Sequence, residues 1–141
     1  MSTRTVITEV TERPLDLAVH VAAVADSRAG ATASFLGVVR DEDGGRSVTR
    51  LEYHAHPTAT AVIADIAAEF AALPDVIGVA VSHRVGMLEV GDVALVAAVS
   101  TGHRAEAFEL CRRLVDDVKH RLPVWKRQEF ADGTDEWVNC P

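Results

Sequence analysis

The sequence predicts an α+β fold in a single domain that spans residues 1–141. Two observations favour this fold class. Segments rich in β-branched residues outnumber the segments with helical periodicity, and several of them follow each other directly along the chain. That order is typical of a mixed or antiparallel sheet rather than of a doubly wound protein. With 48% hydrophobic and 25% charged residues, the chain also has the composition and the length to bury a core.

The first part of the chain predicts three strands and one helix. Residues 4–10 are rich in β-branched residues and predict the first strand. A short helix is expected over residues 14–25, because Pro14 suits a first helical turn and the apolar residues after it recur at helical spacing. Residues 31–39 and 47–55 predict two further strands, which the turn residues of 41–45 join as a hairpin.

The middle of the chain predicts a second helix and two strands. The helix is expected over residues 58–73, which are rich in alanine and end before Pro74. Residues 76–85 and 93–101 predict strands because both segments are rich in valine and other apolar residues. These two strands are joined through Gly86 and a turn over residues 89–92.

The last part of the chain completes three main helices and adds two strands. The third helix is expected over residues 102–122 and ends before Pro123. Residues 124–130 predict an extended segment, and a turn at Gly133 leads to a last strand around Trp137.

The charge of the chain excludes several classes of partner. Fourteen lysines and arginines against 21 acids give a formal net charge of −7. Such an acidic chain is unsuited to general binding of nucleic acids or anionic membranes. No apolar run approaches the roughly 18 residues of a membrane-spanning helix, and the first residues lack an apolar signal segment. We therefore expect a cytoplasmic protein that binds neither nucleic acid nor membrane.

No metal or cofactor site is expected. His54 and His56 share one strand face, but no third ligand accompanies them. Cys111 lies in the apolar stripe of the third helix and is therefore expected in the core. Cys140, near the terminus, has no neighbouring cation that would activate its thiol. The glycine motifs that bind phosphates or dinucleotides do not occur.

A basic segment gives the strongest functional signal. Lys119, Arg121, Lys126 and Arg127 bring four fixed positive charges together without an intervening acid. The first two lie in the last turn of a helix, where cations are favoured in any protein. Lys126 and Arg127 lie beyond the helix, where this explanation does not hold. They predict an anion pocket, with Trp125 as one wall.

Two other arginines are candidates for the same pocket. At the start of the third helix, Thr101 is expected to be the N-cap, which puts His103 and Arg104 in the first turn. A cation there is unfavourable because it lies at the positive end of the helix macrodipole. When an anionic ligand binds, the free backbone amides and the cation can both contact it. An exposed arginine that turns away from the helix end is the simple alternative. Arg40 ends a predicted strand and is a weak signal by itself.

Six short motifs occur in a fixed order. They are Gly-x-Val-Arg at 37–40, Leu51-Glu52-Tyr53, His83-Arg84-Val85-Gly86, Gly91-Asp92, Gly102-His103-Arg104, and Pro123-Val124-Trp125-Lys126-Arg127. Each motif is weak alone, but the ordered set is specific and covers nearly the whole chain. Through this set the chain resembles the large, catalytic subunit of molybdopterin synthase, the MoaE family.

The resemblance implies an α/β hammerhead-type fold and a sulfurtransferase of molybdenum cofactor biosynthesis. In this family, sulfur passes from the C-terminal Gly-Gly thiocarboxylate of a ubiquitin-like small subunit to cyclic pyranopterin monophosphate, which becomes molybdopterin. The resemblance also implies a homodimer of large subunits within a heterotetramer. By motif matching it implies catalytic Lys119 and Lys126, and a substrate site of Val38, Val39, Arg40, His103, Arg104, Lys119, Lys126, Arg127 and Gln128. Gln128 departs from the pattern, because the family commonly has an acid there.

Alternatives stay open at the level of sequence. Lys119 could transfer protons or could capture the acyl group that sulfur transfer leaves behind. A non-catalytic module that binds a phosphorylated metabolite would use the same cations without a reactive lysine. A scaffold subunit is a third interpretation, which the clustering of the cations argues against. A neighbouring gene for a ubiquitin-like protein ending in Gly-Gly would favour the enzyme.

The predicted third helix sets a limit on how the site is built. Arg104 and Lys119 are fifteen residues apart, without a Gly or Pro between them. A continuous helix would separate their Cα atoms by about 22 Å. We therefore expect His103 and Arg104 of one chain to complete the pocket that contains Lys119 and Lys126 of its dimer mate.

Overall fold

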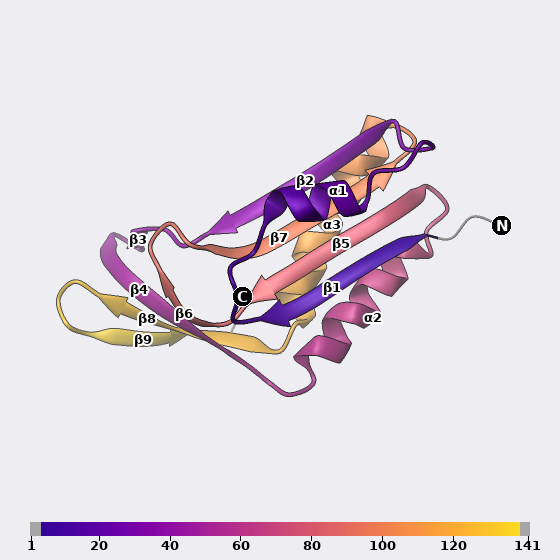
Figure 1. Cartoon of the computed structure of the whole chain (residues 1–141). Coiled ribbons are helices and arrows are strands. Elements are labelled where there is room, and N and C mark those ends of the chain that lie inside the picture. Colours follow the sequence, from indigo (N-terminus) through magenta and orange to yellow (C-terminus); the bar gives the residue numbers. More distant parts are fainter. Residues whose placement is uncertain (1–3, 139–141) are drawn as a thin grey trace.

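Two sheets and three helices make up the α+β fold of residues 4–138, the part of the chain that the computed structural model describes (Figure 1). The helices are α1 (Leu17–Ala23), α2 (Ala59–Ala71) and α3 (Arg104–Arg121). The strands are β1 (Thr5–Thr11), β2 (Ala31–Val38), β3 (Glu42–Asp43), β4 (Arg46–Ala55), β5 (Val76–Arg84), β6 (Gly86–Glu89), β7 (Val93–Thr101), β8 (Val124–Phe130) and β9 (Asp135–Val138).

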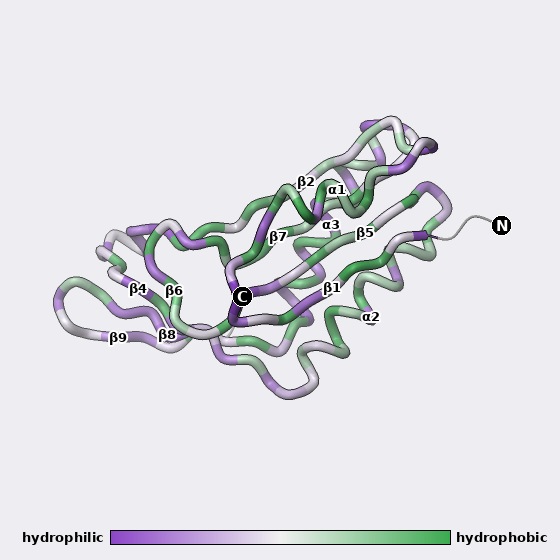
Figure 2. Tube along the Cα trace, in the orientation of Figure 1, coloured by the Kyte–Doolittle hydropathy of each residue, from purple (hydrophilic) through white to green (hydrophobic). Residues whose placement is uncertain are grey.

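The first sheet has four strands in the order β1-β5-β7-β2 and is mixed. β1 runs parallel to β5, whereas the other neighbouring pairs are antiparallel. Helices α2 and α3 pack on one face of this sheet, and the short α1 covers the other face (Figure 1). The central strands β5 and β7 are almost wholly buried, so apolar residues dominate them (Figure 2). The main core therefore lies between this sheet and the two long helices.

The second sheet is antiparallel and is built around β4. This strand pairs with β3, β6 and β8, and β9 extends the sheet beyond β8. A small core of Val39, Leu51, Tyr53, Leu88 and Ala94 lies against it. The tight turn between β3 and β4 depends on Gly44 and Gly45, whose φ angles of 59° and 81° favour residues without a Cβ. The two sheets together place β2, β4, β5, β7 and β8 next to the end of α3.

Most predicted elements agree with the structure within two residues at each end. The first helix is an exception, because it begins at Leu17 rather than at Pro14. Asp16 is its N-cap, and the carboxylate accepts hydrogen bonds from the amides of Ala18 and Val19. A capping acid, rather than the proline, sets the start of this helix.

The expected N-cap of the third helix was wrong. Thr101 is the last residue of β7, where it pairs with both Ala31 and Val76, and its hydroxyl donates to the carbonyl of His103 at 2.6 Å. His103 is the N-cap, and Arg104 is the first helical residue. Thr101 cannot cap the helix because the sheet holds its backbone in the strand ladder.

Residues 86–89, predicted as part of the connection between two strands, form strand β6. They pair with β4 in register, with Gly86 opposite Tyr53 and Glu89 opposite Arg50. The sequence of these four residues gives no strand signal by itself. They form a strand because they pair with β4. Within residues 4–138, none of the helices has the length and apolar character to cross a membrane.

Candidate functional site

A cavity of about 170 Å³ opens between the two sheets, beside the last turn of α3. Apolar side chains of both sheets, including Phe35, Leu51 and Leu95, form part of its lining. The expected site residues Val38 and Val39 also lie in this lining. Because β2, β4, β5, β7, β8 and α3 all contribute residues, the cavity exists only when both sheets are assembled.

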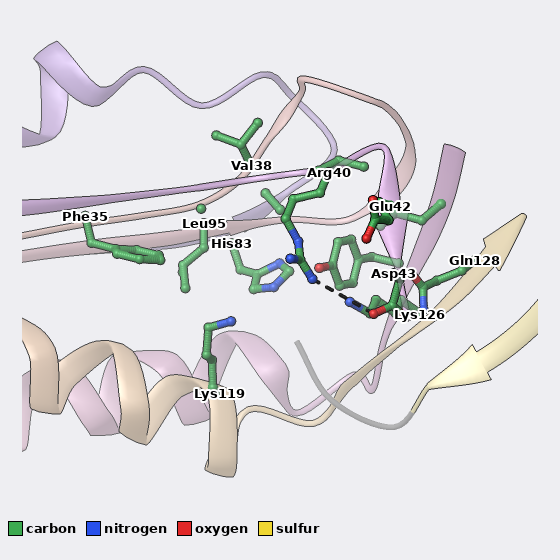
Figure 3. Close-up of a pocket in the computed structure, with 15 residues that line it drawn as sticks. Phe35, Val38, Arg40, Glu42, Asp43, His83, Leu95, Lys119, Lys126 and Gln128 are labelled. Carbon is green, nitrogen blue, oxygen red and sulfur yellow. Dashed lines mark hydrogen bonds and ion pairs between the residues drawn. The ribbon is translucent and has the colours of Figure 1, made fainter. Parts of the chain in front are cut away.

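Three cations from different elements reach the cavity. Lys119 comes from α3, Lys126 from β8, and Arg40 from the segment after β2. In Figure 3 the amine of Lys119 points upward from the helix toward His83, and Arg40 enters from the opposite side. Within residues 4–138, no acid lies within ion-pair distance of Lys119 or Lys126. Their charges are therefore available to an anionic ligand.

The alternation of strand β8 decides which residues of the basic segment face the cavity. Lys126 and Gln128 line it, whereas Trp125 and Arg127 do not. Successive side chains of a strand point to opposite faces, so neighbours in sequence separate. The expectation that Trp125 forms a wall of this cavity was wrong.

Arg127 lies within a network of acids away from the cavity. Its guanidinium is 3.4 Å from Glu52, 3.5 Å from Glu129 and 3.4 Å from Asp135. Arg121 is likewise engaged elsewhere, because it donates two 2.8 Å hydrogen bonds to the carboxylate of Glu69. The four adjacent charges of the basic segment thus divide, and only Lys119 and Lys126 face the cavity.

His103 and Arg104 are exposed and do not line the cavity of their own chain. They lie at the N-terminus of α3, which continues without interruption over 18 residues to Arg121. At 1.5 Å per residue, about 22 Å separates Arg104 from Lys119 along this helix. Within one chain these residues therefore cannot hold the same small ligand.

His83 is a cavity residue that the residue-by-residue reasoning missed. Its side chain is 1% exposed, and its Nδ1 lies 2.7 Å from the carbonyl oxygen of Arg84. A carbonyl only accepts hydrogen bonds, so Nδ1 carries the hydrogen. Burial lowers the pKa of His83 to about 4, and the nearby charges of Lys119 and Lys126 lower it as well. The imidazole is therefore neutral at physiological pH, and it packs edge-on against the ring of Tyr53.

Two acids also line the cavity, which the sequence reasoning did not anticipate. Glu42 and Asp43 form β3 and face the same space as the cations. Gln128 donates from Nε2 to Oδ2 of Asp43 at 2.9 Å, and the guanidinium of Arg40 lies 3.9 Å from Oδ1 (Figure 3). Gln128 is 3% exposed, so its amide is fixed in place. The register of the hairpin could have indicated this placement, because β3 adjoins the strand that carries Leu51 and Tyr53.

Other candidate residues do not form a site. Among the described residues, no group of three or more His, Cys, Asp or Glu side chains is placed to hold a metal ion. His54 lies 3.1 Å from Glu52, whereas His56 contacts Thr58 near the start of α2. Cys111 is buried, and Cys140 lies outside the described residues.

The arrangement favours the binding of an anion and its reaction. Fixed cations stabilise negative charge, and buried apolar side chains such as Leu51 and Leu95 form one part of the cavity wall. Lys119 adds an amine that can donate or accept a proton or act as a nucleophile.

Comparisons with known proteins agree on one family. A family model described as MoaE protein matches residues 10–121. The chain is 39% identical over 132 residues to the molybdopterin synthase catalytic subunit of Nostoc sp., which covers 92% of this chain and 80% of that relative. It is 38% identical over 132 residues to the corresponding subunit of Thermoplasma volcanium, with 93% and 94% covered.

A solved structure extends this agreement to the fold. Molybdopterin synthase from Staphylococcus aureus superposes with a TM-score of 0.84 at 28% identity, over 92% of this chain and 95% of that chain.

Proposed function

Because the chain belongs to the MoaE family, we propose that the cavity around Lys119 is the place where sulfur is transferred. The activity is that of a molybdopterin synthase catalytic subunit, an enzyme of molybdenum cofactor biosynthesis. The observation that carries the location is the convergence of Lys119, Lys126 and Arg40 on one partly apolar cavity.

The proposed reactants explain why the cavity needs several cations. The sulfur acceptor is cyclic pyranopterin monophosphate, and the donor is the C-terminal thiocarboxylate of a ubiquitin-like small subunit that ends in Gly-Gly. Both reactants are anions, so their approach is unfavourable unless fixed positive charges offset the repulsion. Each small subunit delivers one sulfur, and water then hydrolyses its acyl group, so that its C-terminus is left as a carboxylate. Two small subunits are therefore used for each dithiolene.

The proposed assembly is a homodimer of this chain with one small subunit at each end, a heterotetramer. In this assembly Lys119 and Lys126 are the catalytic residues, and Val38, Val39, Arg40 and Gln128 contact the substrate. His103 and Arg104 come from the dimer mate, because α3 separates them from Lys119 within one chain.

The turnover reaction tests this function. Purified chain is mixed with cyclic pyranopterin monophosphate and a thiocarboxylated small subunit, and the product is identified by mass spectrometry. The expected product contains two additional sulfur atoms. A small subunit with an ordinary C-terminal carboxylate is the matched control and should give none. Tight binding of the pterin without any sulfur transfer would instead favour a module that only binds phosphorylated metabolites.

Lys126 and Arg127 form a natural matched pair of adjacent cations. Only Lys126 lines the cavity, whereas three acids surround Arg127. We expect Lys126→Ala to weaken pterin phosphate binding by roughly tenfold or more, because a charged contact is lost. Arg127→Ala should change the affinity by no more than about threefold.

Calorimetry at two salt concentrations provides the measurement for this pair. Wild-type affinity should fall as salt rises, because the cations that remain accessible are screened. Equal losses of affinity in the two variants would show that Arg127 also contributes to binding, for instance toward a second copy of the chain.

A further inference from the structure

Two acids of the cavity, Glu42 and Asp43, have the wrong sign for an anionic substrate, and Asp43 stands out because it also accepts a hydrogen bond from the buried Gln128. Its carboxylate shares the cavity with Arg40, Lys119 and Lys126. A phosphate or a thiocarboxylate would be repelled by it. A pocket that only had to hold anions would function better without this group.

The structure holds the Asp43 carboxylate in a defined orientation. Gln128, itself 3% exposed, donates a 2.9 Å hydrogen bond to Oδ2. Asp43 also pairs with Arg46 in the β3–β4 ladder, and the turn at Gly44 and Gly45 fixes this short hairpin. Its side chain is nevertheless 45% exposed, so a ligand can reach it. A buried amide thus orients a carboxylate that still faces the cavity.

We propose that Asp43 recognises the pterin ring of the substrate by accepting hydrogen bonds from the ring's 2-amino group and its neighbouring N3–H. This inference rests on the proposed function, because it concerns the pterin that the sulfur-transfer reaction uses. The two N–H groups lie side by side on one edge of the ring and match the two oxygens of a carboxylate. Each carboxylate oxygen has two acceptor positions, so Oδ2 can serve Gln128 and the ligand together.

This placement divides the cavity by charge. Lys119 and Lys126 bind the phosphate and the thiocarboxylate, whereas Asp43 accepts hydrogen bonds from the N–H groups of the pterin ring. The simpler alternative is that Asp43 is only a counter-ion of Arg40, 3.9 Å away, which any anion would displace. The two interpretations predict opposite results when the carboxylate is neutralised.

The test compares pterin with lumazine, which carries a carbonyl oxygen at position 2 in place of the amino group. Both fluorescent probes, and inorganic phosphate separately, are titrated into the chain assembled with its small subunit. Asp43→Asn is the test variant, because its amide oxygen can still accept from Gln128 while its NH₂ group opposes the ring donors. Glu42→Gln is the matched control, since it removes the same charge from the neighbouring position of β3.

Wild-type protein should bind pterin about tenfold or more tightly than lumazine. Asp43→Asn should lose this preference through a ten- to hundredfold loss of pterin affinity, roughly the effect of a hydrogen bond to a charged group. Glu42→Gln should keep the preference. Neither variant should bind phosphate more weakly than the wild type does.

Three outcomes would overturn the proposal. The first is a wild type without preference for pterin, and the second is an Asp43→Asn variant that keeps the preference. The third is a gain in affinity of that variant for both probes and for phosphate, which is the result expected if Asp43 is only a counter-ion of Arg40. Sulfur transfer by the wild type is measured on the same preparation. Turnover together with any of these outcomes rejects the role of Asp43 alone, whereas absent turnover rejects the proposed function.

Discussion

Replacement of Lys119 by alanine is expected to abolish sulfur transfer and to leave the fold and the dimer intact. The amine of Lys119 points into the cavity from α3, whereas Lys126, the other lysine among the described residues of the lining, comes from β8 (Figure 3). Loss of a proton-transfer group alone costs roughly a hundredfold or more in rate, and loss of a nucleophile costs at least as much. The residue belongs to the exposed part of α3, whereas the neighbouring Val118 is in the core. Alanine also suits a helix.

Product formation with a thiocarboxylated small subunit measures this effect, and circular dichroism checks the fold. His120→Ala is the matched control, because His120 is exposed in the same helical turn and does not line the cavity. It should retain near-normal turnover. Near-normal turnover of Lys119→Ala would remove this lysine from the mechanism. In the wild type, a covalent adduct of the small subunit on Lys119 would favour acyl capture over proton transfer.

Local patterns predicted those elements whose signal lies in their own residues. The strands over residues 93–101 and 124–130 and the proline-terminated helices agree closely with the structure. β6 could not be predicted in this way, because four residues acquire strand structure only by pairing with β4. The starts of α1 and α3 were misplaced for a related reason. At each start, competing interactions of a polar side chain decide which residue caps the helix.

The cavity could be predicted only in part. Charge and motif order indicated Lys119, Lys126 and Arg40, which the structure brings together. The separation of Lys126 from Arg127 follows from strand alternation and could have been deduced from residues 124–130. His83 was missed because a histidine within an apolar strand resembles a core residue. Asp43 was missed because acids in a glycine-containing turn are usually exposed to solvent.

At the centre of the proposed mechanism is a cavity that two copies of the chain complete together. Helix α3 carries Lys119 near its end and Arg104 at its start, and it has no break between them. The MoaE resemblance implies both residues in the substrate site, but no side chain spans the distance of about 22 Å between them. Arg104 is exposed and does not line its own cavity, so it is available to the cavity of a neighbouring copy.

Mixed dimers test this claim most directly. Two differently tagged chains, Arg104→Ala and Lys119→Ala, are each expected to be inactive as homodimers. Their mixed dimer, purified through both tags, combines both defects in one site and leaves the other site intact. We expect it to recover about half of the wild-type turnover per dimer. The inverse pairing, wild type with an Arg104→Ala/Lys119→Ala double variant, places one defect in each shared site and should be inactive. An inactive first dimer together with a half-active second dimer would contradict the shared site and place all catalytic groups within one chain.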